Sequence, residues 1–222
     1  MAAGTPKAAD GGSHLLYGAR GSGSAAIEAA LTWTGVPFRI VEGATWEPGE
    51  GFEALKATSR LHQVPTLVLP DGTVMTESAA ILIHLGLAHP ASGLLPADAP
   101  RRARALRGLV YVAANCYAAI GVIDYPERWL PASRKPARDA LVAGARERLH
   151  ALWSVFAETF VEGDARYLGG EAPDALDLLA AVVSKWSGAR AYLKAKQPAL
   201  SAIVERLDQH PKLQPVFARH WS

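Results

Sequence analysis

A tight turn at Pro70-Asp71-Gly72 limits the folds open to this chain. The turn separates two short apolar runs within VPTLVLPDGTVMT, residues 64–76. Proline followed by Asp-Gly supplies the backbone conformations of a tight β-hairpin, so the two runs are predicted to pair antiparallel. A sheet made only of parallel strands is therefore not expected here.

The residues around this hairpin predict a β-α-β unit, a helix, the hairpin and a closing helix. The expected segments are a strand at 14–19, a helix at 24–35, a strand at 36–42, a helix at 49–58 and, after the hairpin, a helix at 76–90. The helices are predicted from apolar spacing near 3.6 and the strands from short runs with β-branched residues. This order of elements is thioredoxin-like.

The second half of the chain predicts helices only. The linker at 89–100 is rich in Pro, Ala and Gly, and helical patterns follow it at 101–122, 133–161, 174–192, 197–209 and 212–219. The fold class expected is an α/β thioredoxin-like N-terminal domain at 14–88 plus an all-α C-terminal domain at 101–222. Residues 1–13 are expected to form a flexible tail.

Composition argues against several classes of function. The 23 basic and 21 acidic residues nearly balance, and no long Lys/Arg run occurs, so no nucleic-acid partner is expected. Cys116 is the single cysteine and the seven histidines lack an HExxH spacing, so neither an internal disulfide nor a metal site is predicted. No signal peptide or membrane span is apparent, which favours a cytoplasmic protein without membrane partners.

The stretch from Gly21 to Ala26, GSGSAA, matches the dinucleotide-binding pattern G-x-G-x-x-A. Glu42 lies where an acid that binds the ribose would be expected. The hairpin at Pro70–Gly72 argues against this fold, as does the late position of Gly21 after its strand. NAD binding is therefore kept only as a remote alternative.

Two further pairs of residues favour peptide binding. If the Val64-Pro65 bond is cis, the N–H and C=O of Val64 face outward and can pair with an extended peptide. Glu77-Ser78 begins the next helix, whose N-terminus favours a carboxylate, while the Glu77 side chain can pair with an ammonium. Taken singly, each pair also fits a trans strand-start proline or ordinary helix capping.

Together these features make the chain resemble the cytosolic glutathione transferases, in a bacterial form with a serine-type active-site loop. The resemblance is carried by LLYGARGSGSAAIEAALTWTGVPF, HQVPTLVLPDGTVMTESAAILIHL and APDALD, and it covers nearly the whole chain after residue 13. In APDALD, Asp174 and Asp177 resemble the helix-capping box of the family, which is a structural feature.

The resemblance implies glutathione as co-substrate and assigns residues to each part of the tripeptide. Val64, with Pro65, matches the position that pairs with the cysteinyl unit, and Glu77 with Ser78 matches the pair that holds the γ-glutamyl end. His62 and Gln63 each match a residue that binds the glycine carboxylate in some classes.

Ser22 matches the active-site serine of the delta- and theta-like classes, where the hydroxyl donates to the glutathione thiolate. Tyr17 and Ser24 remain alternatives for this role, although Ser24 is expected to be the helix N-cap and Tyr17 also suits a buried strand. The electrophile pocket is expected to be bordered by the first helix of the all-α domain. Tyr111 and Asn115 could face it, with core packing an equal alternative for Tyr111.

The predicted function is therefore a homodimeric glutathione transferase that conjugates small hydrophobic electrophiles, as in detoxification. A non-catalytic glutathione- or ligand-binding protein on the same fold is the first alternative. A glutathione-dependent reductase or peroxidase is the second, and it is disfavoured because the active-site loop has no cysteine.

Overall fold

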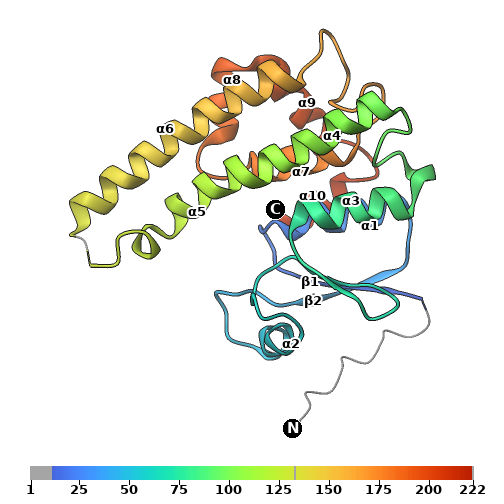
Figure 1. Cartoon of the computed structure of the whole chain (residues 1–222), viewed down its shortest axis with the longest axis horizontal. Helices are drawn as coiled ribbons and strands as arrows, with labels where there is room; N and C mark the ends of the chain where they lie inside the picture. The colour runs from blue at the N-terminus through green and yellow to red at the C-terminus, as the bar shows by residue number, and fades with distance from the viewer. Residues whose placement is uncertain (1–11, 133, 222) are drawn as a thin grey trace. The chain divides into compact units, whose positions relative to one another are not determined.

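The computed structural model describes residues 12–132 and 134–221, and the chain divides into two units (Figure 1). The first unit holds the residues up to Leu95 together with those from Asp208 onward, and the second runs from Pro96 to Leu207. The break after Leu95 falls inside the linker expected at 89–100. Residues 1–11 of the expected tail lie outside the described residues.

The sheet of the first unit has the mixed order β2-β1-β3-β4. Its strands are β1 (His14–Gly18), β2 (Phe38–Glu42), β3 (Thr66–Val68) and β4 (Val74–Met75). β1 pairs parallel with β2 and antiparallel with β3, and β3 pairs antiparallel with β4 through the predicted hairpin. This topology confirms the thioredoxin-like fold and excludes a doubly wound parallel sheet.

Helices cover both faces of this sheet (Figure 1). They are α1 (Ser24–Thr34), α2 (Glu50–Thr58) and α3 (Ser78–Ala88), and the short 3₁₀ turn η1 (Pro90–Ser92) follows α3. α1 and α3 pack together on one face and α2 covers the other. Because side chains alternate along a strand, Leu15 and Tyr17 of β1 both face α2, where they join Leu55 and Val68 in one apolar cluster.

The last helix, α10 (Gln214–His220), belongs to the first unit and packs on α1. The sequence predicts this helix as part of the all-α domain. A helix of seven residues has little stability alone, so its location is set by its partners. Those partners include Glu28 of α1, which pairs with Arg219 and His220.

The second unit is helical, as predicted. Its elements are α4 (Ala99–Tyr111), the π-helical turn η2 (Val112–Tyr117), α5 (Ala118–Asp124), the 3₁₀ turn η3 (Pro126–Arg128), α6 (Lys135–Phe160), α7 (Ala175–Val183), α8 (Ala189–Lys196) and α9 (Pro198–Asp208). The single helix expected over 174–192 is two helices. Ser187 and Gly188 adopt positive φ angles of 57° and 81°, and these left-handed conformations separate α7 from α8.

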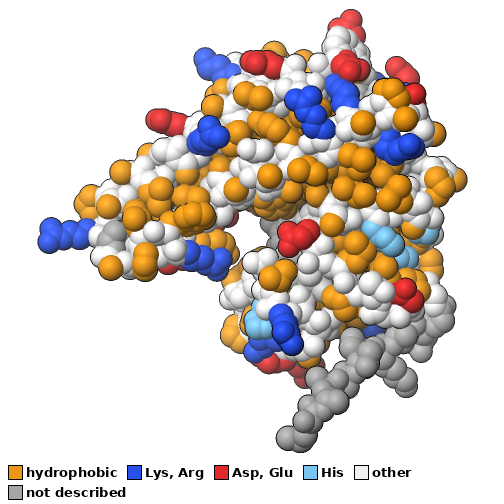
Figure 2. Space-filling model, in the orientation of Figure 1, with side chains coloured by type: hydrophobic (Ala, Val, Ile, Leu, Met, Phe, Trp, Pro, Cys, Tyr) orange, Lys and Arg blue, Asp and Glu red, His pale blue; other side chains and the backbone are white. Residues whose placement is uncertain are grey.

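Residues Ala99–Asp124 form one continuous helix that is long and apolar enough, by length and composition, to cross a membrane. Core helices of soluble proteins pass the same test, and this helix packs against α6 and α7. On the face shown in Figure 2, lysine and arginine side chains are scattered among acidic and apolar ones rather than gathered in one patch.

The start of α7 carries the predicted capping box. Asp174 Oδ1 accepts the N–H groups of Leu176 (2.8 Å) and Asp177 (3.2 Å). The Asp177 carboxylate accepts three main-chain N–H groups, from Leu168, Gly169 and Asp174, at 2.8–3.0 Å. Burial and the neighbouring Asp174 raise the pKa of Asp177, whereas these donors favour its ionised form. Asp177 thus joins the loop before α7 to the helix itself.

Replacing Asp177 with asparagine should lower the free energy of unfolding by about 3 kcal/mol, because an amide NH₂ would face buried N–H donors. Asp174→Asn is the matched control, since one side-chain oxygen suffices at the N-cap and a loss below ~1 kcal/mol is expected. Urea unfolding followed by tryptophan fluorescence measures both. Equal stability of the two variants would contradict the role given to Asp177.

Cys116 lies in η2 with none of its surface exposed, and burial raises the pKa of its thiol to about 12. A thiol that is neutral and buried reacts slowly with disulfide reagents. We expect Cys116 to resist such a reagent in the native protein and to react fully in urea, with free glutathione as the control. Fast labelling of the native protein would show that the Cys116 thiol is more accessible than its burial indicates.

Candidate functional site

The loop between β1 and α1 is closed by two serine hydroxyls. Ser22 Oγ donates to the Ala19 carbonyl at 2.7 Å and accepts the N–H of Ser24 at 3.2 Å. Ser24 Oγ accepts the Ala19 N–H at 3.1 Å and lies 3.2 Å from the Ala19 carbonyl. The two hydroxyl oxygens are 2.8 Å apart. Ser22 and Ser24 therefore form one hydrogen-bonded group against the main chain of Ala19.

This geometry corrects the expected role of Ser24. The N-cap of α1 is Gly23, which has no side chain to cap the helix, and Ser24 is already in the helix. Ser24 instead points back to the end of β1, where Gly18 leaves room for it. A Cβ at Gly18 would lie 2.8 Å from Ser24 Oγ, closer than side chains tolerate. Ser22 provides part of the helix capping, because its hydroxyl oxygen accepts the Ser24 N–H.

Tyr17, the other alternative to Ser22, lies on the α2 face of the sheet. Its ring is 4% exposed, and its hydroxyl accepts a hydrogen bond from Thr58 of α2 at 3.1 Å. The hydroxyl of Tyr17 is therefore buried beneath α2, away from the loop that holds Ser22. These contacts agree with the interpretation of Tyr17 as a buried strand residue.

The Val64-Pro65 peptide bond is cis, as the peptide-binding interpretation required. The loop before it is held by Thr66, whose hydroxyl donates to the Gln63 carbonyl at 2.8 Å. Within residues 12–132 and 134–221, no group forms a hydrogen bond with the N–H or C=O of Val64. Val64 is half-buried and lies just before β3, so its main-chain N–H and C=O offer a donor and an acceptor to a ligand beside the start of that strand.

Glu77 and Ser78 lie at the N-terminus of α3. Glu77 is the N-cap, with a positive φ of 66° that is uncommon for residues other than glycine. Its exposed carboxylate and the Ser78 hydroxyl make no hydrogen bond to any residue that the structure describes. Strained main-chain conformations of this kind are concentrated at ligand-binding sites. The pair combines a free acid, a free hydroxyl and the positive end of a helix.

His62 and Gln63 have exposed side chains in the loop before Pro65. His62 also has a positive φ, 52°. Neither side chain makes a hydrogen bond to another described residue, so both are available to a ligand and the structure does not choose between them.

A groove that the sequence analysis missed lies between the β1–α1 loop and α2. It has a volume of about 360 Å³ and is lined by Arg20, Glu42, Ala44, Trp46, Glu47, Pro48, Gly49 and Phe52. Arg20 is exposed and makes no ion pair with any described residue, and the Trp46 side chain is 56% exposed. Of the residues that line it, the sequence analysis singled out Glu42 alone, as a candidate for ribose binding.

Glu42 has a structural partner, which overturns its role as a ribose-binding acid. Arg219 Nη1 donates to Glu42 at 2.8 Å, and the same guanidinium forms two hydrogen bonds with Glu28, at 3.1 and 2.6 Å. His220 Nε2 lies 2.9 Å from Glu28, and His220 Nδ1 accepts the Gly21 N–H at 3.1 Å. Sequence analysis did not identify Arg219 or His220.

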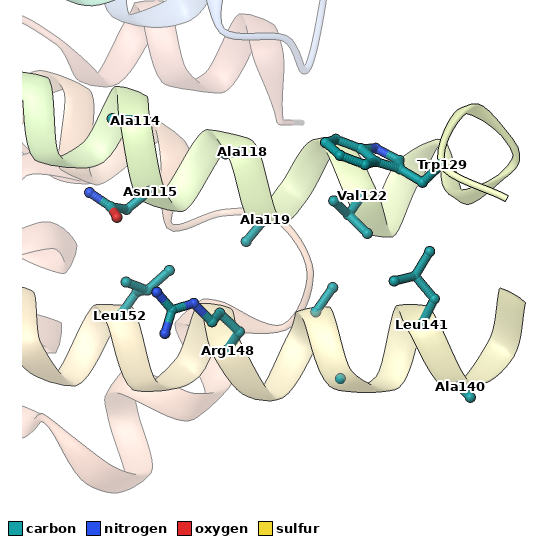
Figure 3. A pocket seen from close by; sticks show the side chains of 12 residues that line it. Ala114, Asn115, Ala118, Ala119, Val122, Trp129, Ala140, Leu141, Arg148 and Leu152 are labelled. Atoms are coloured by element: carbon teal, nitrogen blue, oxygen red, sulfur yellow. The ribbon is translucent and has the colours of Figure 1, made fainter. Parts of the chain in front are cut away.

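The second unit has a groove between the helix of η2 and α5 and the facing α6, with a volume of about 570 Å³ (Figure 3). Asn115 lines it, opposite Arg148 and Leu152 of α6. Tyr111 is not among the lining residues. Its hydroxyl donates to the Leu152 carbonyl at 2.8 Å and its ring packs on Phe156, so the core role of Tyr111 is the one observed.

Among the described residues, no group of three or more histidine, cysteine or acidic side chains is placed to hold a metal ion. The polar groups that the sequence predicts to bind a ligand lie in the loop after β1, in the loop before β3 and at the start of α3. All of them lie in the first unit.

Comparison with known proteins agrees with this arrangement. Residues 16–93 match the family model for the glutathione S-transferase N-terminal domain. The chain is 30% identical over 209 residues to the uncharacterized GST-like protein YncG of Escherichia coli K12, covering 92% of this chain and 97% of YncG.

Solved structures share the fold. A glutathione transferase homologue from Sulfitobacter with bound glutathione superposes with a TM-score of 0.77 at 23% identity, over 91% of this chain and 96% of that one. A sphingomonad glutathione S-transferase complexed with glutathione gives 0.71 at 26% identity, over 94% and 100%. On the family model, the YncG match and this fold, the chain belongs to the glutathione S-transferase family.

Proposed function

We propose that this protein is a glutathione transferase that binds glutathione along its first unit and adds the thiolate to a small hydrophobic electrophile. The observation that carries the proposal is the set of unpartnered polar groups at Val64, Glu77 and Ser78. Family relatives whose structures contain glutathione support the choice of ligand.

The cysteinyl unit would pair with the main chain of Val64. The Val64 N–H can donate and its C=O can accept, which provides the two hydrogen bonds of one added strand residue. Val64 is half-buried, so the surrounding protein excludes part of the water that would compete for these bonds.

The γ-glutamyl end would bind at the start of α3. Its carboxylate suits the N–H groups of the first turn and the Ser78 hydroxyl, because the helix dipole is positive there. Its ammonium suits the Glu77 carboxylate, which has no other partner among the described residues. For the glycine carboxylate, His62 and Gln63 stay alternative donors.

Ser22 would stabilise the thiolate. A free thiol titrates near ~8.5, and lowering its pKa by about two units requires roughly 2.7 kcal/mol of preferential stabilisation. A hydroxyl hydrogen bond to sulfur together with the N-terminus of α1 can supply this amount. The serine donates to sulfur and forms no covalent bond with substrate.

The neighbouring Ser24 makes this donation possible. Ser22 donates its proton to the Ala19 carbonyl, and Ser24 Oγ lies 3.2 Å from the same oxygen. If Ser22 rotates its proton toward sulfur, Ser24 can donate to Ala19 in its place, so no buried acceptor loses its partner. Ser22 Oγ keeps the Ser24 N–H as a donor throughout.

A non-catalytic glutathione-binding protein is the second candidate, and one observation favours it. The Ser22 proton already has an acceptor, the Ala19 carbonyl, so donation to sulfur requires Ser24 to replace Ser22 as the donor to that carbonyl. A reductase or peroxidase is less suitable because the single cysteine, Cys116, lies buried in a helix of the second unit. A homodimer, a cytoplasmic location and a role in detoxification remain predictions.

The ultraviolet absorbance of the thiolate, titrated on bound glutathione, tests the proposal. We expect a thiol pKa about two units below that of free glutathione in the native protein. In Ser22→Ala the pKa should return near the free value, so the thiolate fraction at neutral pH and turnover of an aryl halide fall roughly twentyfold. Glutathione affinity should change less than twofold.

Tyr17→Phe is the matched control, since it removes the other candidate hydroxyl and should leave the thiol pKa unchanged. A turnover loss below threefold in Ser22→Ala would remove Ser22 from the mechanism. Glutathione that binds to the native protein with an unshifted thiol pKa would favour the non-catalytic alternative.

Glu77→Gln should weaken glutathione binding about tenfold or more, because a charge-assisted hydrogen bond to the ammonium is worth roughly 1.5–3 kcal/mol. Isothermal titration calorimetry measures the affinity. Glu53→Gln on α2 removes a carboxylate that pairs with Lys56 on the surface and should have no effect. Equal affinities in the two variants would exclude Glu77 from the site.

A further inference from the structure

We infer that His220, at the end of α10, is a positioning residue for the active-site loop. By accepting the Gly21 N–H, it fixes the peptide between Arg20 and Gly21, one residue before Ser22, and so sets the direction of the Ser22 hydroxyl. The inference rests on the proposed function, because the consequence that it predicts is a change in thiol activation.

The side chain of His220 is fully buried and its two nitrogens have different partners. Nδ1 accepts the Gly21 N–H at 3.1 Å, and Nε2 lies 2.9 Å from Glu28 Oε2. A main-chain N–H can only donate, so Nδ1 must be unprotonated and the ring proton lies on Nε2, facing the carboxylate. The imidazole thus links the buried acid of α1 to the active-site loop.

Gly21 is where the loop turns, and its φ of 67° lies in the left-handed region. The turn is short, because the Ser22 N–H bonds to the Ala19 carbonyl at 3.2 Å. The loop also lies close to α10, since a Cβ on Gly21 would be 3.8 Å from the His220 carbonyl oxygen. Rotation of the peptide between Arg20 and Gly21, which carries the Gly21 N–H, would therefore break the contact with His220 and move Ser22.

Arg219 holds the acid that orients His220. It donates to both oxygens of Glu28 and also to Glu42 of β2, so one guanidinium connects α10, α1 and the sheet. Burial alone would raise the pKa of Glu28, but the hydrogen bonds from His220 and Arg219 hold it below its usual range. Glu28 is thus an ionised acceptor for the Nε2 proton, and it fixes the tautomer that leaves Nδ1 free to accept.

Two substitutions at His220 test the hydrogen bonds of its two ring nitrogens separately. Asparagine at 220 places an oxygen near the position of Nδ1 and keeps an acceptor for Gly21, but it loses the donor to Glu28. Glutamine places its NH₂ near Nε2 and keeps the donor to Glu28, but it loses the acceptor for Gly21. Both replace an aromatic ring by a flexible amide, so their costs in folding stability should be similar.

His220→Gln should raise the pKa of bound glutathione by about one unit, which reduces the thiolate fraction and kcat at neutral pH about threefold. Its affinity for glutathione should stay within twofold, because Val64, Glu77 and Ser78 are unchanged. His220→Asn should keep the thiol pKa near that of the native protein. Urea unfolding of both variants provides the control for stability.

The inference is overturned if the thiol pKa rises in both variants in proportion to their loss of folding stability, whether or not the acceptor for Gly21 is kept. It is also overturned if His220→Gln activates glutathione as the native protein does. A native protein that does not lower the thiol pKa at all would instead refute the proposed function. The two failures are therefore distinguishable.

A measurement on the native protein needs neither a stable variant nor activity. In ¹⁵N-labelled protein, a scalar coupling across the hydrogen bond should join the Gly21 amide nitrogen to His220 Nδ1. The ¹⁵N shifts of the ring should identify Nε2 as the protonated nitrogen. Absence of the coupling, or a proton on Nδ1, would overturn the inference directly.

Discussion

Strand β1 has hydrogen-bonded partners on both edges, and the arrangement of the site depends on this pairing. All five of its residues are buried, with β2 parallel on one side and β3 antiparallel on the other. The active-site loop follows β1, the Val64-Pro65 bond precedes β3, and β4 leads into Glu77. Three segments that are far apart in the chain are brought together because their strands share one sheet.

The two units use polar groups in different ways. At the start of α7, Asp177 is surrounded by three main-chain donors, so its hydrogen-bonding capacity is used for structure. At Val64 the main-chain N–H and C=O, and at the start of α3 the side chains of Glu77 and Ser78, have no partner among the described residues. Buried polar groups in proteins are nearly always paired, so the half-buried main-chain groups of Val64, which are left unpaired before β3, are available to a ligand.

The features that sequence predicted best were those defined by neighbouring residues. Pro70-Asp71-Gly72 determines a turn locally, Val64-Pro65 has only two isomers, and Asp174 reaches an N–H three residues on. The position of α10 could not be found this way, because Arg219 pairs with an acid 191 residues earlier in the chain. Glu28, the one acid in the Ala-rich α1, gave the only sign that such a partner was needed. The G-x-G-x-x-A match failed for a related reason, since a short motif does not specify the strands around it.

The Ala19 carbonyl, which both serine hydroxyls can reach, determines how precisely the active-site loop must be positioned. A serine hydroxyl has a single proton, and in this loop the Ala19 carbonyl and any thiolate compete for it. A modest rotation of the loop could therefore leave the proton on Ala19, and activation then depends on the groups that hold Gly21 in place. In this chain those groups come from α10, the helix whose sequence gave the least indication of a functional role.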